Sequence, residues 1–428
     1  MRLKKRNTRS VGAGHVGLAT MTLLVGLLVT APNASADQGD CAQPVSEGPS
    51  PVSTDCLYIL KAAVSLEVCD PECICQPSGG GGNGVSATDA LVCLNSVVGN
   101  PVTLQCPCQA PDFIAGLGVF TKRAASYATA DLEGSWYLHS IAAGPEAPDR
   151  TRGDLDVQSD GAFSGRLVDI NGEVDFISGN LNVSVDGIVD CNVCLPPFRG
   201  ALDAGKTVIV FTDTWDSGTD ELLIAVKQAQ NTFYEQEDIA GPWRLNQLTS
   251  GPSSPLWVRG PVEISPSGVL SGDLLDAYGE TSPLSGIITL SVNGIADCVG
   301  CESEFEAAVD ADMTVTVYSQ TLEDGSTDLG VLVSQGPSYS QSDLTGGWNF
   351  NVIGAGSLDY GWLRGAVTVA EDGTFTGDAQ DSDGFTDPFD GMLEITAGGI
   401  VTDPTDNESS LECALDSGKT VMTCTFSE

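Results

Sequence analysis

Basic residues are scarce in this chain of 428 residues, which has 18 Lys and Arg against 58 Asp and Glu and a formal net charge of −40. Nucleic-acid binding needs clustered cations that displace counterions from phosphates, so this composition argues against DNA or RNA as a partner. The same charge argues against an anionic membrane surface. Only two histidines occur, His15 and His139. The chain therefore has too few histidines for a His-rich metal site, and little basis for a Ser-His-Asp catalytic triad. The sequence also lacks a phosphate-binding loop, a nucleophile elbow and a CxxCH haem-attachment motif.

Long apolar runs are confined to the N-terminus. Basic residues between 2 and 9 precede the apolar run 16–30, and Ala34-Ser35-Ala36 offers small residues for cleavage. This pattern predicts a secretory signal peptide over 1–36. An uncleaved anchor helix would need about 20 apolar residues, and this run is shorter and is followed by Pro32. We therefore expect a secreted or cell-surface protein with no transmembrane segment after cleavage.

All 14 cysteines lie after the predicted cleavage site. In an exported chain an even number of cysteines indicates disulfides, and an oxidising compartment favours bridges over a zinc site at Cys69, Cys73 and Cys75. Eight cysteines fall within 41–108, and their pairing is left open. The remaining candidates for disulfides are Cys191, Cys194, Cys298, Cys301, Cys413 and Cys424.

The cysteine-rich segment 37–108 contains two matching stretches that begin at Asp55 and Asp89, 34 residues apart. Each predicts a short helix with one apolar stripe, because aliphatic residues recur at helical spacing. The stripes consist of Leu57, Leu60 and Val64 in one copy and Leu91, Leu94 and Val98 in the other. Ser and Thr residues before each stretch are typical of helix N-caps.

Residues 52–57 and 85–91 resemble the start of the duplicated helices of dockerin modules. The resemblance implies that each opening Asp closes a calcium loop, and that the helix pair docks onto a partner protein. Calcium needs six to eight oxygen ligands. The corresponding loop positions are Pro44, Ser46 and Gly48 in one copy and Ser78, Gly80 and Gly82 in the other. We therefore expect no cofactor and no metal, calcium being the one ion that the resemblance implies.

The rest of the chain repeats three times. Each repeat opens on Asp-x-x-Gly-x-Trp, and sixteen residues after that Trp comes an Arg-Gly pair. The tryptophans are Trp136, Trp243 and Trp348, and the arginines are Arg152, Arg259 and Arg364. The predicted units are a linker at 109–130 and β repeats at 131–230, 238–335 and 343–428, the last of which stops before its final strand.

Each repeat alternates short apolar and polar runs divided by Asp-Gly turns, which is typical of β-meanders. About eight strands in each repeat predict a mainly β protein of three tandem small barrels, with two-sheet sandwiches as the alternative. The Gly-x-Trp opening resembles the first strand of calycins, the lipocalin and avidin group of barrels. That resemblance implies binding of small ligands in the barrel mouth.

Several repeated residues have structural interpretations. The recurring Asp169, Asp276 and Asp381 predict turns closed by a glycine. Because an arginine over an indole gains cation–π energy, we expect each repeated arginine to pack near its repeat's opening tryptophan. The two Cys-x-x-Cys pairs predict closed four-residue loops. In a terminal hairpin Cys413 faces Cys424, which predicts a bridge at the edge of an incomplete third barrel that is open to another strand.

No catalytic constellation is shared by the repeats, so we expect no enzyme. The leading hypothesis is a non-catalytic interaction or structural protein with multivalent β domains. Its partner would be a protein or a polysaccharide, and its oligomeric state is left open. The alternatives are small-ligand binding within the barrels and, third, an extracellular carbohydrate-active hydrolase that uses two carboxylates.

Overall fold

The fold was analysed in a computed structural model, which confirms a mainly β chain with barrel sheets and two helices near the N-terminus. The structure describes residues 42, 51–64, 66, 75, 77, 85–100, 114–144, 149–191, 194, 198–215, 217–230, 233–251, 256–301, 305–322, 324–356, 360–405 and 410–427. The predicted signal peptide lies outside these residues, as do Cys41, Cys69, Cys73, Cys106 and Cys108.

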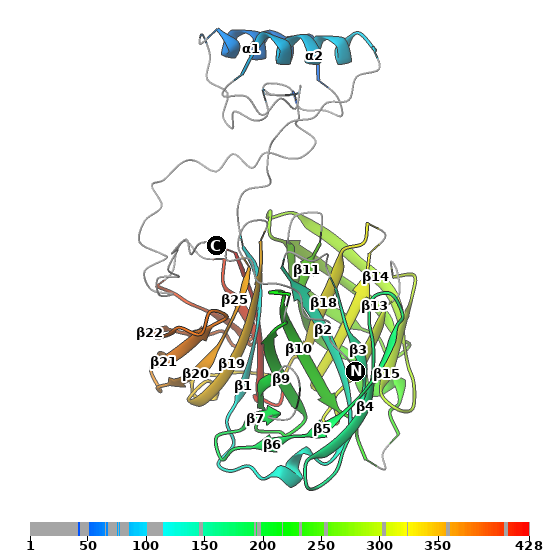
Figure 1. The fold of residues 1–428 in the computed structure, drawn as a ribbon, viewed down its shortest axis with the longest axis vertical. Helices are drawn as coiled ribbons and strands as arrows, with labels where there is room; N and C mark the ends of the chain where they lie inside the picture. The colour runs from blue at the N-terminus through cyan, green and yellow to red at the C-terminus, as the bar shows by residue number, and fades with distance from the viewer. Residues whose placement is uncertain are drawn as a thin grey trace, which may run out of the picture.

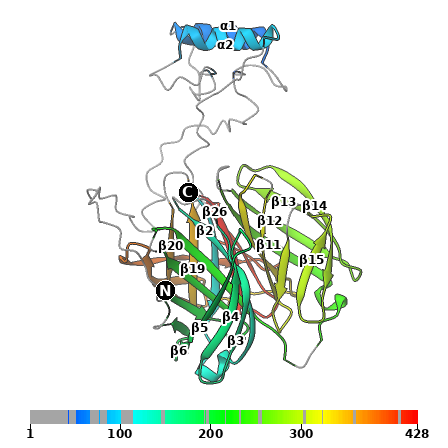
Figure 2. The ribbon, with the colours of Figure 1, turned by 45° about the vertical axis from the view of Figure 1, so that its right-hand side comes forward.

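The two helices are α1 (Ser53–Ala63) and α2 (Ala87–Val97). They lie side by side in both views of the molecule (Figures 1 and 2). The Cys56–Cys93 disulfide joins them. Together they form the head, whose small core consists of Ala42, Cys56, Ile59, Cys75, Ala90 and Cys93.

The first repeat folds as an up-and-down meander in which the last strand pairs with the first. A short 3₁₀ helix, η3 (Thr129–Leu132), leads into it. Its strands are β2 (Gly134–Ala143), β3 (Arg152–Val157), β4 (Ala162–Val168), β5 (Val174–Asn180), β6 (Asn182–Val183), β7 (Ile188–Cys191), β8 (Phe198–Leu202), β9 (Val208–Thr214) and β10 (Asp220–Lys227).

The second repeat is a closed eight-stranded barrel that follows η4 (Gln236–Ile239). Its strands are β11 (Gly241–Ser250), β12 (Leu256–Ile264), β13 (Val269–Asp276), β14 (Thr281–Leu290), β15 (Ile295–Val299), β16 (Glu306–Val309), β17 (Val315–Thr321) and β18 (Thr327–Ser334). The long β14 corresponds to β5 and β6 of the first repeat, where the strand is interrupted at Leu181.

The third repeat follows η5 (Gln341–Asp343). Its strands are β19 (Gly346–Ala355), β20 (Gly361–Val369), β21 (Thr374–Asp381), β22 (Thr386–Met392), β23 (Glu394–Ile395), β24 (Ile400–Thr402), β25 (Glu412–Leu415) and β26 (Val421–Ser427). The segment therefore ends one strand earlier than the first two repeats.

The missing strand comes from the other end of the β region. Strand β1 (Ala115–Lys122) lies in the segment expected to be a linker, and it pairs antiparallel with both β26 and β19. It takes the place that β10 and β18 take in the first two barrels. The expectations of a linker at 115–122 and of an open edge on β26 are therefore wrong.

Each barrel is filled by its own large side chains. The second barrel packs Trp243, Leu245 and Tyr318 inside, and corresponding clusters fill the first and third. Gly116 on β1 serves this packing, since a Cβ at that position would lie 2.0 Å from the ring of Phe426.

A further apolar cluster joins all three barrels. It takes Leu117 and Val119 from β1, Ile224 from β10, Val331 from β18 and Ile353 from β19, all of them fully buried. Because side chains alternate across a strand, the barrel strands bury one face inside their own barrel and the other in this shared core. The three barrels are thus one packed body.

The contacts between barrels follow one cyclic pattern, and we call the three contacts seams. At the first seam, His139 of barrel one meets Ser319 of barrel two, with Nδ1 and Oγ 3.0 Å apart. At the second, Asn246 of barrel two receives a hydrogen bond from Thr425 at 3.2 Å. At the third, Asn351 of barrel three receives one from Thr212 of barrel one at 3.0 Å. These residues occupy equivalent positions, so the three repeats close into a ring.

None of the described helices is long and apolar enough to cross a membrane.

Candidate functional site

The opening tryptophans are buried in the barrel cores, as a structural role requires. Trp136, Trp243 and Trp348 are all at most 3% exposed. Each indole N–H donates to the backbone oxygen four residues earlier, at 2.7–2.8 Å. The polar atom of each ring is thereby used within the fold.

The repeated arginines do not pack on these tryptophans, and the expected pairing is wrong. The guanidinium of Arg259 lies 4.3 Å from the ring centroid of Trp257, and Arg364 lies 4.3 Å from that of Trp362. The stacked ring is two residues earlier on the same strand, where alternation directs both side chains to one face. The first repeat has Arg150 at that position, and Arg152 approaches a glutamate of the next barrel instead.

A lysine from the closing strand covers two of the opening tryptophans. Lys227 Nζ lies 5.4 Å from the ring centroid of Trp136, and Lys122 Nζ lies 5.4 Å from that of Trp348. Our sequence reasoning missed both lysines, although a signal was present. The repeat extends upstream of its Trp, because Tyr127, Tyr234 and Tyr339 each precede the Trp by nine residues.

The predicted disulfides and turns outside the head are confirmed. The structure bonds Cys191 to Cys194, Cys298 to Cys301 and Cys413 to Cys424. At the repeated turns, Gly172 N donates to Asp169 O at 3.1 Å, and Gly279 and Gly384 donate in the same way to Asp276 and Asp381 at 3.0 Å. These residues therefore stabilise the scaffold locally.

The head helices both begin with an aspartate cap. Asp55 Oδ2 accepts the Val52 N–H at 2.8 Å, and Asp89 Oδ2 accepts the Ser86 N–H at 2.8 Å. An acid in the first turn satisfies a free donor and complements the helix dipole. The dockerin resemblance gives these same aspartates a calcium role.

That calcium role stays a prediction, because the other loop positions, from Pro44 to Gly48 and from Ser78 to Gly82, lie outside the described residues. Within the part of the chain that the structure describes, no group of three or more His, Cys, Asp or Glu is arranged to hold a metal ion.

The apolar stripes of the head face the solvent. Leu57 and Leu60 on α1 and Val64 at its C-cap are 43–59% exposed. Their counterparts, Leu91 and Leu94 on α2 and Val98 at its C-cap, are 45–64% exposed. We call these six residues the head face. Packing between the helices uses Cys56, Ile59, Ala90 and Cys93 instead. The sequence located the stripes but not the side on which they lie.

The head face is a candidate site for binding an apolar partner surface. Soluble proteins rarely leave this many large aliphatic side chains exposed on two short helices without a function. The Cys56–Cys93 bridge holds the helix pair together. The leucines and valines are therefore not needed to hold the pair together and are available for contact.

Comparison with known proteins assigns no family. No protein-family model matches the chain, and no curated protein matches it in sequence. Among solved structures, it is similar to a DUF3598-family protein of unknown function from Nostoc punctiforme, with 10% identity, a TM-score of 0.18 and coverage of 71% of this chain and 99% of that one.

Two further solved structures show likenesses of the same size. Kievitone hydratase from Nectria haematococca has 10% identity and a TM-score of 0.19, covering 50% of this chain and 97% of that one. Transferrin binding protein B from Neisseria meningitidis has 10% identity and a TM-score of 0.16, covering 73% and 74%. Scores this low carry no fold family, activity or ligand over to this chain.

Proposed function

We propose that this chain is an exported, non-catalytic binding protein that attaches to a protein partner through the head face. The exposure of the six aliphatic side chains on the two cross-linked helices is the observation that carries this proposal. The barrel body is then a rigid acidic platform that the head attaches to its partner.

The energetics of the head face suit a moderately tight contact. Burying a half-exposed leucine or valine stabilises a complex by about 1 kcal/mol. Six such residues together offset the several kcal/mol that association costs in lost freedom. None of the six is aromatic, and aliphatic side chains suit a protein surface better than a polysaccharide.

The barrel interiors support this proposal over ligand binding within the barrels. In the second barrel the core holds Trp243, Tyr318 and Leu332, each at most 5% exposed. A barrel that binds a small ligand needs an apolar cavity of a few hundred Å³, and large side chains take up this space.

The test is native mass spectrometry of the full-length protein recovered from the culture medium of its producing organism. The head variant is Leu57→Glu with Leu91→Glu. A matched control places the same charges at two exposed apolar residues of the first barrel, Val174→Glu with Phe176→Glu, which are 46% and 84% exposed. Identical charge changes separate the effect of the site from that of the charge.

We expect a partner protein to accompany the wild type and the control and to be lost from the head variant. Partner retention by the head variant, or a wild type that carries no partner, would overturn the proposal. The same spectra test export, because the mature chain should begin near Asp37.

A further inference from the structure

The seams place the repeated arginine opposite one position of the neighbouring barrel. At the first seam Arg152 Nε lies 3.6 Å from Glu306 Oε1, and at the second Arg259 Nε lies 3.8 Å from Glu412 Oε1. Glu306 and Glu412 occupy equivalent positions, two residues before the alanine that begins an Ala-x-Asp motif near the end of each repeat. An Arg–Glu pair is therefore the pattern at two of the three seams.

The third seam reverses the charge of this position. The residue equivalent to the two glutamates is Arg199, so Arg364 of barrel three meets a second arginine. Burial lowers the pKa of Arg364, and the next largest cause is the positive charge of Arg199. Both guanidinium groups line one pocket, so two like charges face each other where the other seams have an ion pair.

A second position at this seam has also gained a cation. Gln228 and Gln335 follow β10 and β18, and each donates through Nε2 to a backbone oxygen of the neighbouring barrel, Val309 O and Leu415 O. The equivalent residue after β1 is Arg123, which donates instead to Val367 O at 3.3 Å. Its Nε is buried without a hydrogen-bond partner.

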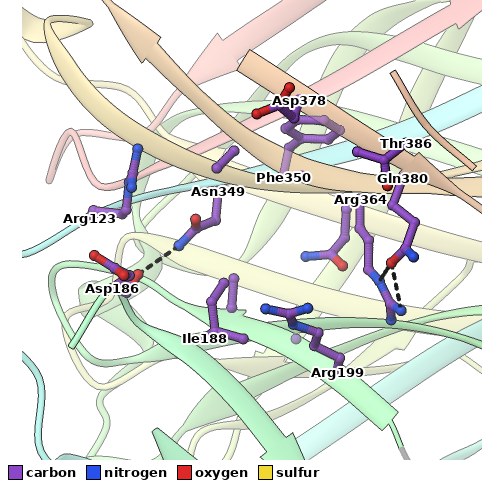
Figure 3. Close-up of a pocket in the computed structure, with 15 residues that line it drawn as sticks. Arg123, Asp186, Ile188, Arg199, Asn349, Phe350, Arg364, Asp378, Gln380 and Thr386 are labelled. Atoms are coloured by element: carbon purple, nitrogen blue, oxygen red, sulfur yellow. Dashed lines mark hydrogen bonds between the residues drawn. The ribbon is translucent and has the colours of Figure 1, made fainter. Parts of the chain in front are cut away.

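These arginines line one pocket between β7 and β8 of the first barrel and β19 to β22 of the third. Its volume is about 380 Å³, which lies within the range of small-molecule sites. Figure 3 shows Arg199 and Arg364 together on one side of the pocket and Arg123 on the other. The half-buried Ile188 supplies an apolar side chain between them.

The local anchors hold Arg364 in place. Its Nη1 donates to Thr212 O at 3.3 Å, and its Nε and Nη2 both donate to Gln380 Oε1 at 3.2 and 3.1 Å. The guanidinium also stacks on Trp362. A guanidinium fixed in this way loses little side-chain entropy when an anion binds.

Acidic residues also lie near the pocket, and Asp213 is the carboxylate whose charge acts most strongly on Arg364. Arg199 Nε lies 3.7 Å from Asp190 Oδ1, with both side chains about half exposed, and such a pair is worth little. The carboxylates of Asp186 and Asp378 also line the pocket, and both residues are exposed. Three arginines around one pocket stand out in a chain that has only 18 basic residues.

We propose that the pocket at the third seam binds a small organic carboxylate, with Arg199 and Arg364 holding the carboxylate group and Arg123 facing the other end of the molecule. Arginine suits this role because its planar fork matches a carboxylate in two parallel hydrogen bonds. A singly charged group is favoured over phosphate because the net charge of −40 repels doubly charged anions more strongly. The side chain of Ile188 gives the carbon part of such a molecule an apolar contact.

The test is isothermal titration of the full-length protein with glucuronate, inorganic phosphate, sulfate and uncharged glucose. Arg199→Glu restores the residue found at the other two seams, so an Arg–Glu pair should form and the fold should be kept. Arg166→Glu is the matched control, because it makes the same charge change at an exposed arginine of β4 outside the pocket.

We expect the wild type to bind glucuronate saturably, and to bind phosphate, sulfate and glucose at least tenfold more weakly. Arg199→Glu should lower glucuronate affinity at least tenfold, Arg166→Glu should change it less than twofold, and the melting temperature of Arg199→Glu should not fall. If Arg199→Glu fails to fold, the neutral Arg199→Gln replaces it with the same expectation.

Three results would overturn the proposal: no saturable glucuronate binding, unchanged affinity in the Arg199 variants, or tighter binding of phosphate or sulfate than of glucuronate. The head face does not contribute to this site, so its variants leave these outcomes unchanged.

Discussion

Lys122 lies over the indole ring of Trp348, more than two hundred residues later in the chain, and its Nζ donates to Asp343 O at 2.7 Å. Lys227 makes the same two contacts with Trp136 and with Asp131 O, at 2.8 Å, inside the first barrel. This contact lies within one repeat in the first barrel, whereas in the third it joins the N-terminal strand β1 to the third repeat. The pairing of β1 with β26 joins the two ends of the β region. The body is a ring of three barrels closed by its own N-terminal strand.

A circular permutant tests this closure. We expect residues 123–427 followed by a five-residue turn and residues 115–122 to fold with a melting temperature within a few degrees of residues 115–427, because β9 and β10 are joined by a turn of that length. Residues 123–427 alone should self-associate through the exposed edge of β26. Circular dichroism and sedimentation velocity measure both. A monomeric, equally stable chain without β1 would contradict the closure.

His139 predicts an acid-sensitive seam. Burial, followed by the charges of Arg152 and Arg150, lowers the pKa of His139 to about 3. The unfolded chain then binds this proton between about pH 6.5 and 3 while the folded chain does not, so stability is lost as the pH falls through this window. His139→Asn introduces the residue found at the other two seams. We expect the wild type to lose about 2 kcal/mol of its free energy of unfolding between pH 8 and pH 5 because of His139, and the variant not to show this loss.

Denaturant unfolding at the two pH values measures this difference, with wild type and variant compared at each. The comparison cancels the titration of the many carboxylates that both chains share. An equal loss of stability in the two proteins would show that His139 is not responsible.

Arg259→Ala should destabilise the body by about 2–3 kcal/mol, through lost stacking on Trp257 and lost hydrogen bonds. Arg259 is only 9% exposed, and its Nη1 donates to Ser410 O at 2.6 Å across the second seam. Arg166→Ala, at a half-exposed arginine, should cost less than about 0.5 kcal/mol. Chemical denaturation checks both, and similar costs for the two variants would refute the seam role of Arg259.

Replacing Cys413 and Cys424 together with alanine should lower stability by about 3 kcal/mol, on the model in which a disulfide restricts the unfolded chain. The shorter loop between Cys191 and Cys194 should give about 2 kcal/mol on the same model. Cys424 lies on β26 and Cys191 on β7, and each of these strands is paired on both sides, so neither double variant should self-associate. Thermal melts followed by light scattering show which double variant loses more stability. Aggregation of the Cys413/Cys424 variant alone would instead indicate that this disulfide protects an exposed strand edge.

The repeats and their strands were predictable because turns and alternation are local properties of the chain. The Asp and Gly residues at 169, 172, 276, 279, 381 and 384 form the predicted turns, and the pairing of Cys413 with Cys424 follows from hairpin register alone. Such features depend on residues a few positions apart, so the sequence contains enough information to predict them.

The ring, the shared core and the pocket depend on contacts between distant segments. The sequence of residues 115–122 does not show that β1 pairs with β26. The backbone hydrogen bonds of an edge strand can be made by any strand with a similar alternation of apolar and polar residues. The stacking of Arg364 on Trp362 is local to one strand, but the meeting of Arg364 with Arg199 arises only once barrel three packs on barrel one. The side on which Leu57 and Leu91 lie was equally undetermined, since helical spacing identifies a stripe but not what covers it. Those outcomes were decided by packing, which buries whichever faces the whole chain brings together.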